Sequence, residues 1–294
     1  MKLLVKLLLL ALVIYYVPKF CHKQTDGFMI GKIHSHLPFD PRWEVEDSEE
    51  VNLSNLFSQP FTYLASGGQC YAFVSADEKY VVKFFKHHLR RLPFLVKHLP
   101  LPSSLAEKRA DQLARRKKKL LRDFRSYKLA YEELKEETGL IFVHLNSTKD
   151  LNCSAVLIDK LGIRHTVNLD QVEFILQKKG TLALSYLDDL IHKGELEKAK
   201  EGVESLVNLV LSRCQKGIFD EDAKIHRNFG FVDGQAMLID VGRLKPDPRR
   251  KDKSVQRADL EKIVAPLRAH LHSLLPELAL HLNTYIEKRW DEES

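Results

Sequence analysis

Three short runs of aromatic and β-branched residues, separated by brief polar turns, most strongly limit the folds open to this chain. They are followed by a long stretch with helical spacing, by two more apolar runs and by a mainly helical half. Short runs joined by polar turns predict antiparallel strands. Strands first and helices later predict an α+β fold in two lobes, a small antiparallel sheet with one long helix and then a helical lobe. The strand candidates are residues 61–64, 70–74, 80–85, 140–145 and 155–158.

The long helix has a recognisable start and end. Ser103 or Ser104 can cap its first turn, and Gly139 can end it after about Glu137. Its apolar residues recur at helical spacing and predict one core-facing stripe, formed by Leu120, Phe124, Tyr127, Tyr131 and Leu134. Further helices are expected over residues 170–178, 182–192, 195–215 and 256–288.

The length and net charge of the chain limit its domain organisation but do not indicate one function. The chain has 294 residues, a formal net charge of +6 and a pI of about 9.0, which favours anionic partners. Its four cysteines lie far apart and predict free, mostly buried thiols, with a disulfide left open if the domain is exported. We expect four segments: residues 1–20, an irregular linker over 21–58, an N-lobe over 59–162 and a C-lobe over 163–294.

The first twenty residues differ from the rest of the chain. Lys2 and Lys6 are followed by about eleven apolar residues, as in a secretory signal. This run is short for a membrane span, although the two lysines could snorkel and lengthen it. No small-residue cleavage site follows, and Tyr15 and Tyr16 suit a membrane interface. These features predict an uncleaved N-terminal membrane anchor, with a cleaved signal as the alternative. The side of the membrane is not readable, although dependence on ATP would favour the cytoplasmic face.

A basic run, Arg115–Lys119, lies on the expected long helix. It is interpreted either as a solvated helix face or, beside an anchored N-terminus, as a contact for acidic lipid. No aromatic residues are interleaved with the charges, so nucleic acid is not expected as a partner.

Lys83 lies inside an apolar strand run, one hairpin after a glycine turn. A lysine on such a strand is either an edge residue that discourages aggregation or a buried cation with a partner. The turn at Gly67 and Gly68 exposes backbone N–H groups that can bind phosphate, and a lysine on the next strand can reach the same oxygens.

The stretch from residue 217 to residue 243 combines polar side chains with a predicted hairpin. Residues 229–231 and 235–239 are the two strands, and Asp240 follows the second of them. Asp240 and Asn228 offer oxygen ligands of the kind that hard cations prefer. Asp222 can orient or deprotonate a hydroxyl and Lys224 can neutralise a phosphoryl group. The alternative is a hairpin with turn-forming Asp and Asn and no chemistry.

Together these segments resemble the protein-kinase-like superfamily over about residues 60–290, and its small-molecule and lipopolysaccharide kinases more than its protein kinases. The likeness is carried by Ser66–Gln69 as a phosphate loop, Val81–Lys83 as the lysine strand, the long helix, Asp222–Asn228 as a catalytic loop and Asp240–Gly242 in place of Asp-Phe-Gly. The resemblance implies ATP and Mg²⁺ as cofactors.

The resemblance also assigns roles. Lys83 would hold the α- and β-phosphates of ATP, Gly67 and Gly68 would form the phosphate loop, and Asp123 on the long helix is expected to pair with Lys83. In the second half, Asn228 and Asp240 would bind the metal, Asp222 would act on the acceptor hydroxyl and Lys224 would neutralise the transferring group.

Departures from the family pattern are clear. Asp222 precedes Asn228 by six residues rather than five, so the loop is one residue longer or Asp222 is not the base; Asp220 is farther away still. The segment after Asp240 is short and basic, without a peptide-docking platform. We expect a membrane-tethered ATP- and Mg²⁺-dependent phosphotransferase acting on a small molecule, lipid or glycan. The alternatives are a pseudokinase used for docking, or a basic membrane-surface protein without a nucleotide site.

Overall fold

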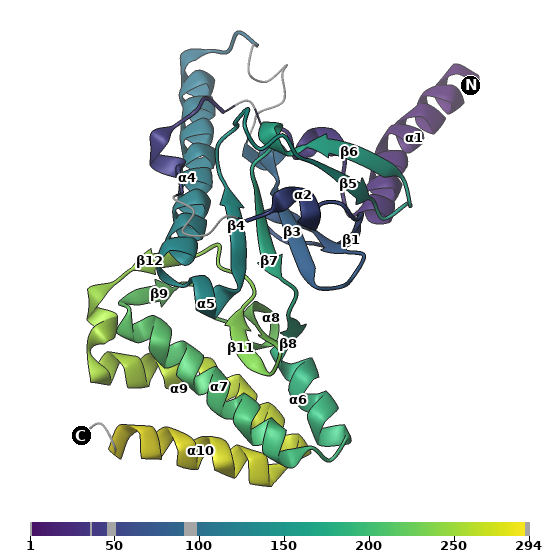
Figure 1. The fold of residues 1–294 in the computed structure, drawn as a ribbon. Helices are drawn as coiled ribbons and strands as arrows, with labels where there is room; N and C mark the ends of the chain where they lie inside the picture. Colours follow the sequence, from purple (N-terminus) through teal and green to yellow (C-terminus); the bar gives the residue numbers. More distant parts are fainter. Residues whose placement is uncertain (1, 36, 46–50, 91–98, 292–294) are drawn as a thin grey trace. The chain divides into compact units, whose positions relative to one another are not determined.

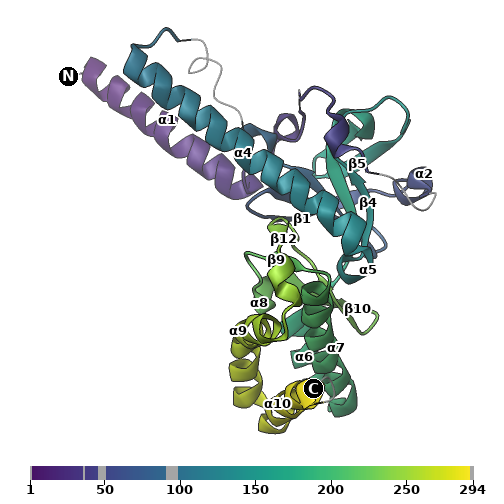
Figure 2. The ribbon, with the colours of Figure 1, turned by 90° about the vertical axis from the view of Figure 1, so that its left-hand side faces the viewer.

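The computed structural model describes residues 2–35, 37–45, 51–90 and 99–291, and its secondary structure confirms the α+β class (Figures 1 and 2). The chain divides into two compact units. Unit 1 comprises Met1–Leu120 and His144–Leu176, and unit 2 comprises Leu121–Val143 and Gln177–Ser294. The four-segment division expected from the sequence stays a prediction.

The first three strands form the antiparallel sheet that the sequence predicted. Phe61 lies opposite Ser75, and Cys70 lies opposite Phe85. Their buried aromatic side chains, Phe61, Phe73 and Phe84, are fully enclosed in the core of unit 1, because aromatic residues remove the largest apolar areas from water. The strands are β1 (Phe61–Ser66), β2 (Cys70–Ser75) and β3 (Tyr80–Phe85).

The remaining strands of this sheet include two that the sequence did not predict. β5 (Ser154–Ile158) lies parallel to β1 and antiparallel to β6 (Arg164–Asn168). The helix expected over residues 170–178 is wrong, because β7 (Phe174–Lys178) is a strand. Four consecutive side chains of β7 are buried, which removes the alternation that marks a half-buried strand. With β4 (Leu140–His144), the strand order is β4-β7-β3-β2-β1-β5-β6.

The N-terminal segment is helical but is not a membrane span. α1 (Lys2–Thr25) carries exposed apolar side chains, among them Leu10 and Phe20. Within the part of the chain that the structure describes, no helix has the length and apolar character needed to cross a bilayer. The expected membrane anchor, and the localisation based on it, are therefore wrong. A span needs about 20 predominantly apolar residues, whereas this run is bounded by Lys6 and by Pro18.

The predicted long helix is confirmed over most of its length. α4 (Ser103–Glu133) continues, after a break at Leu134, into the single turn α5 (Lys135–Thr138). Gly139 ends it with φ of +60°, a conformation that favours glycine. All five residues of the predicted apolar stripe are buried. The charged side chains of the basic run Arg115–Lys119 lie mainly exposed, as expected for a solvated face.

Short helical turns connect the larger elements of unit 1. Asp40 caps one of them by accepting a hydrogen bond from the Arg42 amide, and Trp43 from the same turn is buried. The four cysteines of the chain are free, and three of them are buried. The short elements are η1 (Ile30–Lys32), η2 (Pro41–Trp43), α2 (Leu53–Leu56), η3 (His87–Arg90) and η4 (Leu169–Gln171).

Unit 2 is built mainly from helices. The single helix expected over residues 256–288 is two helices, because Leu275 is extended and Pro276 starts a new helix, as proline does at a first turn. The last two helices pack on each other and on α7 (Figure 1). The helices are α6 (Ala183–His192), α7 (Leu196–Gln215), α9 (Lys253–Leu274) and α10 (Pro276–Asp291).

Two small sheets complete unit 2. The predicted hairpin is confirmed by β10 (Phe229–Val232) and β11 (Gln235–Leu238), which β8 (Thr181–Leu182) joins on the β10 side. The turn residues Asp233 and Gly234 have φ of +50° and +81°, as the tightest hairpin turns require. The other elements are β9 (Ile218–Asp220) paired with β12 (Leu244–Pro246), α8 (Ile225–Asn228) and η5 (Pro248–Lys251).

Candidate active site

The β10–β11 hairpin brings two of the predicted metal ligands next to each other within unit 2. Phe229 lies opposite Leu238, and the amide of Ile239 donates to the carbonyl oxygen of Asn228 at 2.8 Å. Asp240 follows directly after Ile239. Residues that are twelve positions apart in sequence therefore become neighbours across one hairpin ladder.

Asn228 is held firmly at the start of this hairpin. Its side chain is buried, and its Nδ2 donates to the carbonyl oxygen of Asp222. The amide nitrogen is thus used within the loop, which leaves the side-chain oxygen Oδ1 as the group that can coordinate a cation.

Asp240 is exposed at the end of β11. Its Oδ1 accepts the amide proton of Gly242 at 3.1 Å, which orients the carboxylate. The chain beyond it is fixed by Ser126 on α4, whose hydroxyl donates to the carbonyl oxygen of Val241 and accepts from the amide of Leu244. A hydroxyl buried on a helix thus positions the strand end that carries Asp240.

Asp222 and Lys224 lie together in the loop before α8. Lys224 Nζ is 3.1 Å from the Asp222 carboxylate. Arg227 also contacts Asp222 and donates to both of its oxygens, at 3.0 and 2.9 Å. Burial acts to raise the pKa of Asp222, but the hydrogen bond from Lys224 and the charge of Arg227 outweigh it and hold this pKa below its ordinary value. The carboxylate is therefore ionised at neutral pH.

Asp220 lies beneath this loop, a buried position that the sequence pattern did not reveal. Its Oδ1 accepts the Asp222 amide proton at 2.9 Å, and its Oδ2 lies 3.8 Å from Arg213, too far for a hydrogen bond. Burial raises the pKa of Asp220, and the negative charges of Asp240 and Asp222 add to this effect.

The turn between β1 and β2 in unit 1 carries Gly67 and Gly68, both exposed. The amide of Gly67 donates to the carbonyl oxygen of Cys70 at 3.0 Å. A methyl group on Gly68 would meet no described atom within 4 Å, and one on Gly67 would meet only Cys70 O, at 3.7 Å. The turn is therefore open, with room for a ligand beside its backbone.

Lys83 lies half-buried in β3, opposite Ala72 of β2. Asp123, the acid expected to pair with it, is fully buried on α4 and lies 3.1 Å from Arg122. Lys83 belongs to unit 1 and Asp123 to unit 2. Their pairing stays a prediction.

Lys86, which was missed from the sequence, contacts the glycine turn. Lys86 Nζ donates to the carbonyl oxygen of Gly67 at 2.5 Å and to the hydroxyl of Ser66 at 2.6 Å, and it lies 4.5 Å above the Tyr71 ring. Burial lowers the pKa of Lys86. The sequence does offer a signal, because Lys86 directly follows the third strand of the hairpin pair and can reach back to its turn.

The donor atoms of the site are oxygens, which suit a hard cation. Among the residues that the structure describes, no group of three or more His, Cys, Asp or Glu side chains could hold a metal ion. Asn228 and Asp240 would offer two side-chain oxygens, the number of ligands that proteins often give to Mg²⁺ when a phosphorylated substrate supplies others. The residues present thus fit the magnesium–nucleotide pair that the resemblance implies.

No protein-family model matches this chain, and no curated protein matches its sequence. Among solved structures, it is similar to a crystal structure of WbdD, with 18% identity and a TM-score of 0.36 over 78% of this chain and 46% of that chain. A structure described as the bifunctional kinase-methyltransferase WbdD matches with 20% identity and a TM-score of 0.34, over 76% and 43% of the two chains. The Rv3197–erythromycin complex from Mycobacterium tuberculosis matches with 15% identity and a TM-score of 0.34, over 72% and 56%.

The chain thus spans less than half of the WbdD chains that it matches. These TM-scores describe a distant similarity.

Proposed function

We propose that this protein is a phosphotransferase of the kinase type that uses ATP and Mg²⁺. The observation that carries the proposal is the hydrogen bond from Ile239 to the Asn228 carbonyl, which makes Asn228 a neighbour of Asp240 in unit 2. An amide oxygen and a carboxylate at adjoining strand ends, beside an ionised Asp222, form a set suited to holding a cation and a hydroxyl.

The proposed roles in unit 2 follow from the chemistry of each side chain. Asn228 Oδ1 and the Asp240 carboxylate would hold Mg²⁺. Bound Mg-ATP would supply the phosphoryl group and the cation that offsets its charge. Asp222 would orient the acceptor hydroxyl and take its proton, and Lys224 would offset negative charge beside it.

In unit 1, Lys83 and the open turn at Gly67 and Gly68 are proposed to bind nucleotide phosphates. Lys86 supports this role because it holds the turn through the Gly67 carbonyl and the Ser66 hydroxyl. Backbone N–H groups that face outward from such a turn can bind phosphate oxygens.

The acceptor is proposed to be a small molecule or a glycan, and not a protein. Only β12 and the single turn η5 lie between Asp240 and the start of α9 at Lys253. A segment this short leaves little chain to form a docking surface for an extended peptide.

Binding and turnover of Mg-ATP test the proposal. We expect Mg²⁺-dependent stabilisation by ATP in a thermal shift, and slow ATP hydrolysis that Asp240→Asn lowers by about 100-fold or more. Asp233→Asn is the matched control, because Asp233 lies in an exposed turn at φ of +50°, which asparagine tolerates. The proposal would be overturned if the affinity for ATP were the same with and without Mg²⁺ and the same in wild type and Asp240→Asn.

A second candidate, a pseudokinase that binds nucleotide for docking, is favoured by one contact. Arg227 occupies both oxygens of Asp222, so the proposed base is already paired. Arg227→Gln separates the two candidates. If the protein is an enzyme, its ATP hydrolysis rate stays the same or increases in Arg227→Gln, because Asp222 is no longer paired with Arg227. If it is a pseudokinase, both wild type and Arg227→Gln bind Mg-ATP without turnover.

A further inference from the structure

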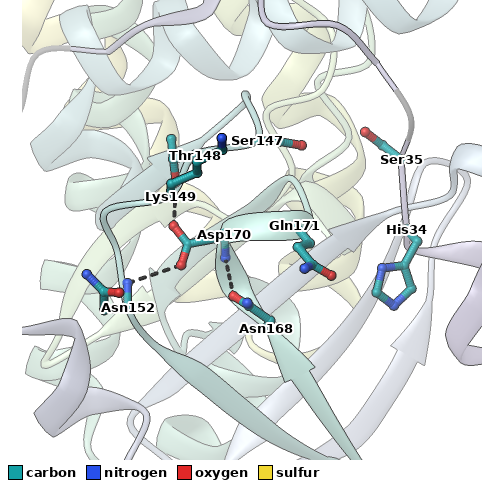
Figure 3. Close-up of a pocket in the computed structure, with 9 residues that line it drawn as sticks. All are labelled: His34, Ser35, Ser147, Thr148, Lys149, Asn152, Asn168, Asp170 and Gln171. Atoms are coloured by element: carbon teal, nitrogen blue, oxygen red, sulfur yellow. Dashed lines mark hydrogen bonds between the residues drawn. The ribbon is translucent and has the colours of Figure 1, made fainter.

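A cavity of about 570 Å³ in unit 1 is lined by polar side chains and shares no residue with the candidate active site (Figure 3). Its volume falls within the range of about 300–1,000 Å³ that small-molecule sites occupy. The lining comprises three hydroxyl groups, three carboxamides, a histidine, a lysine and a carboxylate, without an aliphatic or aromatic hydrocarbon side chain. Such a surface excludes an apolar ligand, since its polar groups would lose their hydrogen bonds to water.

Asp170 is the central charged group of this cavity, and it is buried, with 7% of its surface exposed. Its Oδ1 accepts from the Thr148 hydroxyl at 2.8 Å and from the Leu151 amide at 3.0 Å, while its Oδ2 accepts from the Asn152 amide at 3.1 Å. A carboxylate offers about four lone-pair positions. One position on Oδ2 is thus left for a donor group of a ligand.

The same carboxylate is fixed in place by its own backbone. The Asp170 amide donates to Asn168 Oδ1 at 2.9 Å, and the Asp170 carbonyl accepts from the Thr148 amide at 2.9 Å. The Asn168 side chain therefore presents its NH₂ group as a donor beside the acceptor of Asp170 (Figure 3).

The opposite wall of the cavity is anchored by a second buried network. Ser35 donates to Glu173 at 2.5 Å, and the other oxygen of Glu173 lies 2.8 Å from His87 Nε2. All three side chains are buried. Burial acts to raise the pKa of Glu173, but the neighbouring His87 and the hydrogen bond from Ser35 outweigh it and lower this pKa, so the acid is ionised. A buried network of this kind fixes the position of Ser35.

The segment that contains Ser35 is also hydrogen-bonded to the loop that contains Ser147 and Thr148. The Asp40 amide donates to Asn146 Oδ1 at 3.1 Å, and Asn146 Nδ2 donates to the Asp40 carbonyl at 3.0 Å. In Figure 3 the side chains of Ser35 and Ser147 point toward one another. Two networks therefore preorganise the cavity, as a binding site requires.

We propose that this cavity binds a neutral polyhydroxylated molecule, a sugar unit in particular. Each sugar hydroxyl both donates and accepts a hydrogen bond, and the cavity offers both kinds of partner, an acceptor on Asp170 and donors on Asn168, Gln171 and Ser147. The carboxylate disfavours an anion, and Lys149 at the same cavity disfavours a cation.

Titration of the full chain with D-glucose, D-galactose and N-acetyl-D-glucosamine tests the proposal, by isothermal calorimetry up to about 20 mM, which covers the weak range of sugar sites. We expect saturable binding of at least one of them. Gln171→Ala and Ser147→Ala each remove one partner outside the buried networks and weaken this binding about 3- to 10-fold. The control is Gln112→Ala, an exposed glutamine on α4 that leaves binding unchanged.

Three outcomes would overturn the proposal. One is that none of the three sugars binds saturably. Another is that sugar binding is the same in wild type, Gln171→Ala and Ser147→Ala. The third is that inorganic phosphate, titrated in parallel, binds in place of the sugars and loses affinity in Gln171→Ala. None of these outcomes depends on nucleotide binding, so the result is independent of the proposed phosphotransferase activity.

Discussion

The guanidinium of Arg213 lies 2.7 Å from the carboxylate of Asp259, and both side chains are buried in unit 2. The same guanidinium is 3.8 Å from the buried carboxylate of Asp220. Arg250 adds a second positive charge, 3.4 Å from Asp259. These ion pairs connect α7, which contains Arg213, with α9 and with β9, the strand that precedes the proposed catalytic loop.

Arg213→Met is expected to lower the free energy of unfolding by about 3–5 kcal/mol, because it leaves two buried carboxylates without their main partner. Urea denaturation measures the change. The matched control is Arg257→Met, which breaks an exposed pair with Glu287 and costs about 0–1 kcal/mol. Equal effects of the two substitutions would show that the buried charges do not hold this part of unit 2 together.

The strands and helices with a clear periodicity could be predicted from the sequence. The first hairpins, the apolar stripe of α4 and the hairpin around Asp233 and Gly234 all show local patterns that their structures confirm. β7 was missed because burial on both faces gives the unbroken apolar run Phe174–Leu176, followed by buried Gln177, and a periodicity test does not separate such a short run from a helix.

Part of the candidate site could also be predicted. The neighbouring positions of Asn228 and Asp240 follow from a local hairpin, whose strands and turn are visible in the sequence. The contacts of Asp220 with Arg213 and of Lys86 with Gly67 depend on burial and on side-chain direction. The burial of Asp220 has no local sequence pattern, whereas the position of Lys86 directly after the third strand does offer one. The membrane anchor was wrong because the prediction relied on snorkelling by Lys2 and Lys6 to lengthen an apolar run that is too short to span a bilayer.

Gly230→Ala is expected to destabilise unit 2 by about 1–3 kcal/mol. A methyl group there would lie 2.5 Å from the carbonyl oxygen of Thr181 on the neighbouring strand and 2.4 Å from the Ile239 side chain. Gly68→Ala is the control, because its methyl group would enter open space. Thermal unfolding by circular dichroism measures both variants, and a Gly230→Ala protein as stable as Gly68→Ala would contradict the close approach of β8 and β10.

Asp222→Asn is expected to lower the ATP hydrolysis rate by about 10²- to 10⁴-fold, the range for loss of a general base, while leaving Mg-ATP affinity within about twofold. Glu221→Gln is the control, since this neighbouring acid is exposed and pairs with Lys245. Steady-state kinetics and calorimetry separate the two effects. Full activity in Asp222→Asn would assign the base to another residue, and the buried acid Asp220 would then be tested by Asp220→Asn.

His88 makes the stability of unit 1 depend on pH. Burial, with the charges of Lys32 and Lys86, lowers the pKa of His88 from 6.5 to about 4. Between these two values the unfolded chain takes up a proton that the folded chain does not, so stability falls as pH drops from about 6.5 toward 4.

His88→Gln keeps a neutral side chain and removes this loss, which we expect to be about 1–2 kcal/mol after allowance for partial exposure. Urea denaturation at pH 7 and at pH 5 measures it, with His226→Gln as the exposed control. An equal loss of stability in wild type and in His88→Gln would contradict the half-buried, neutral state of His88.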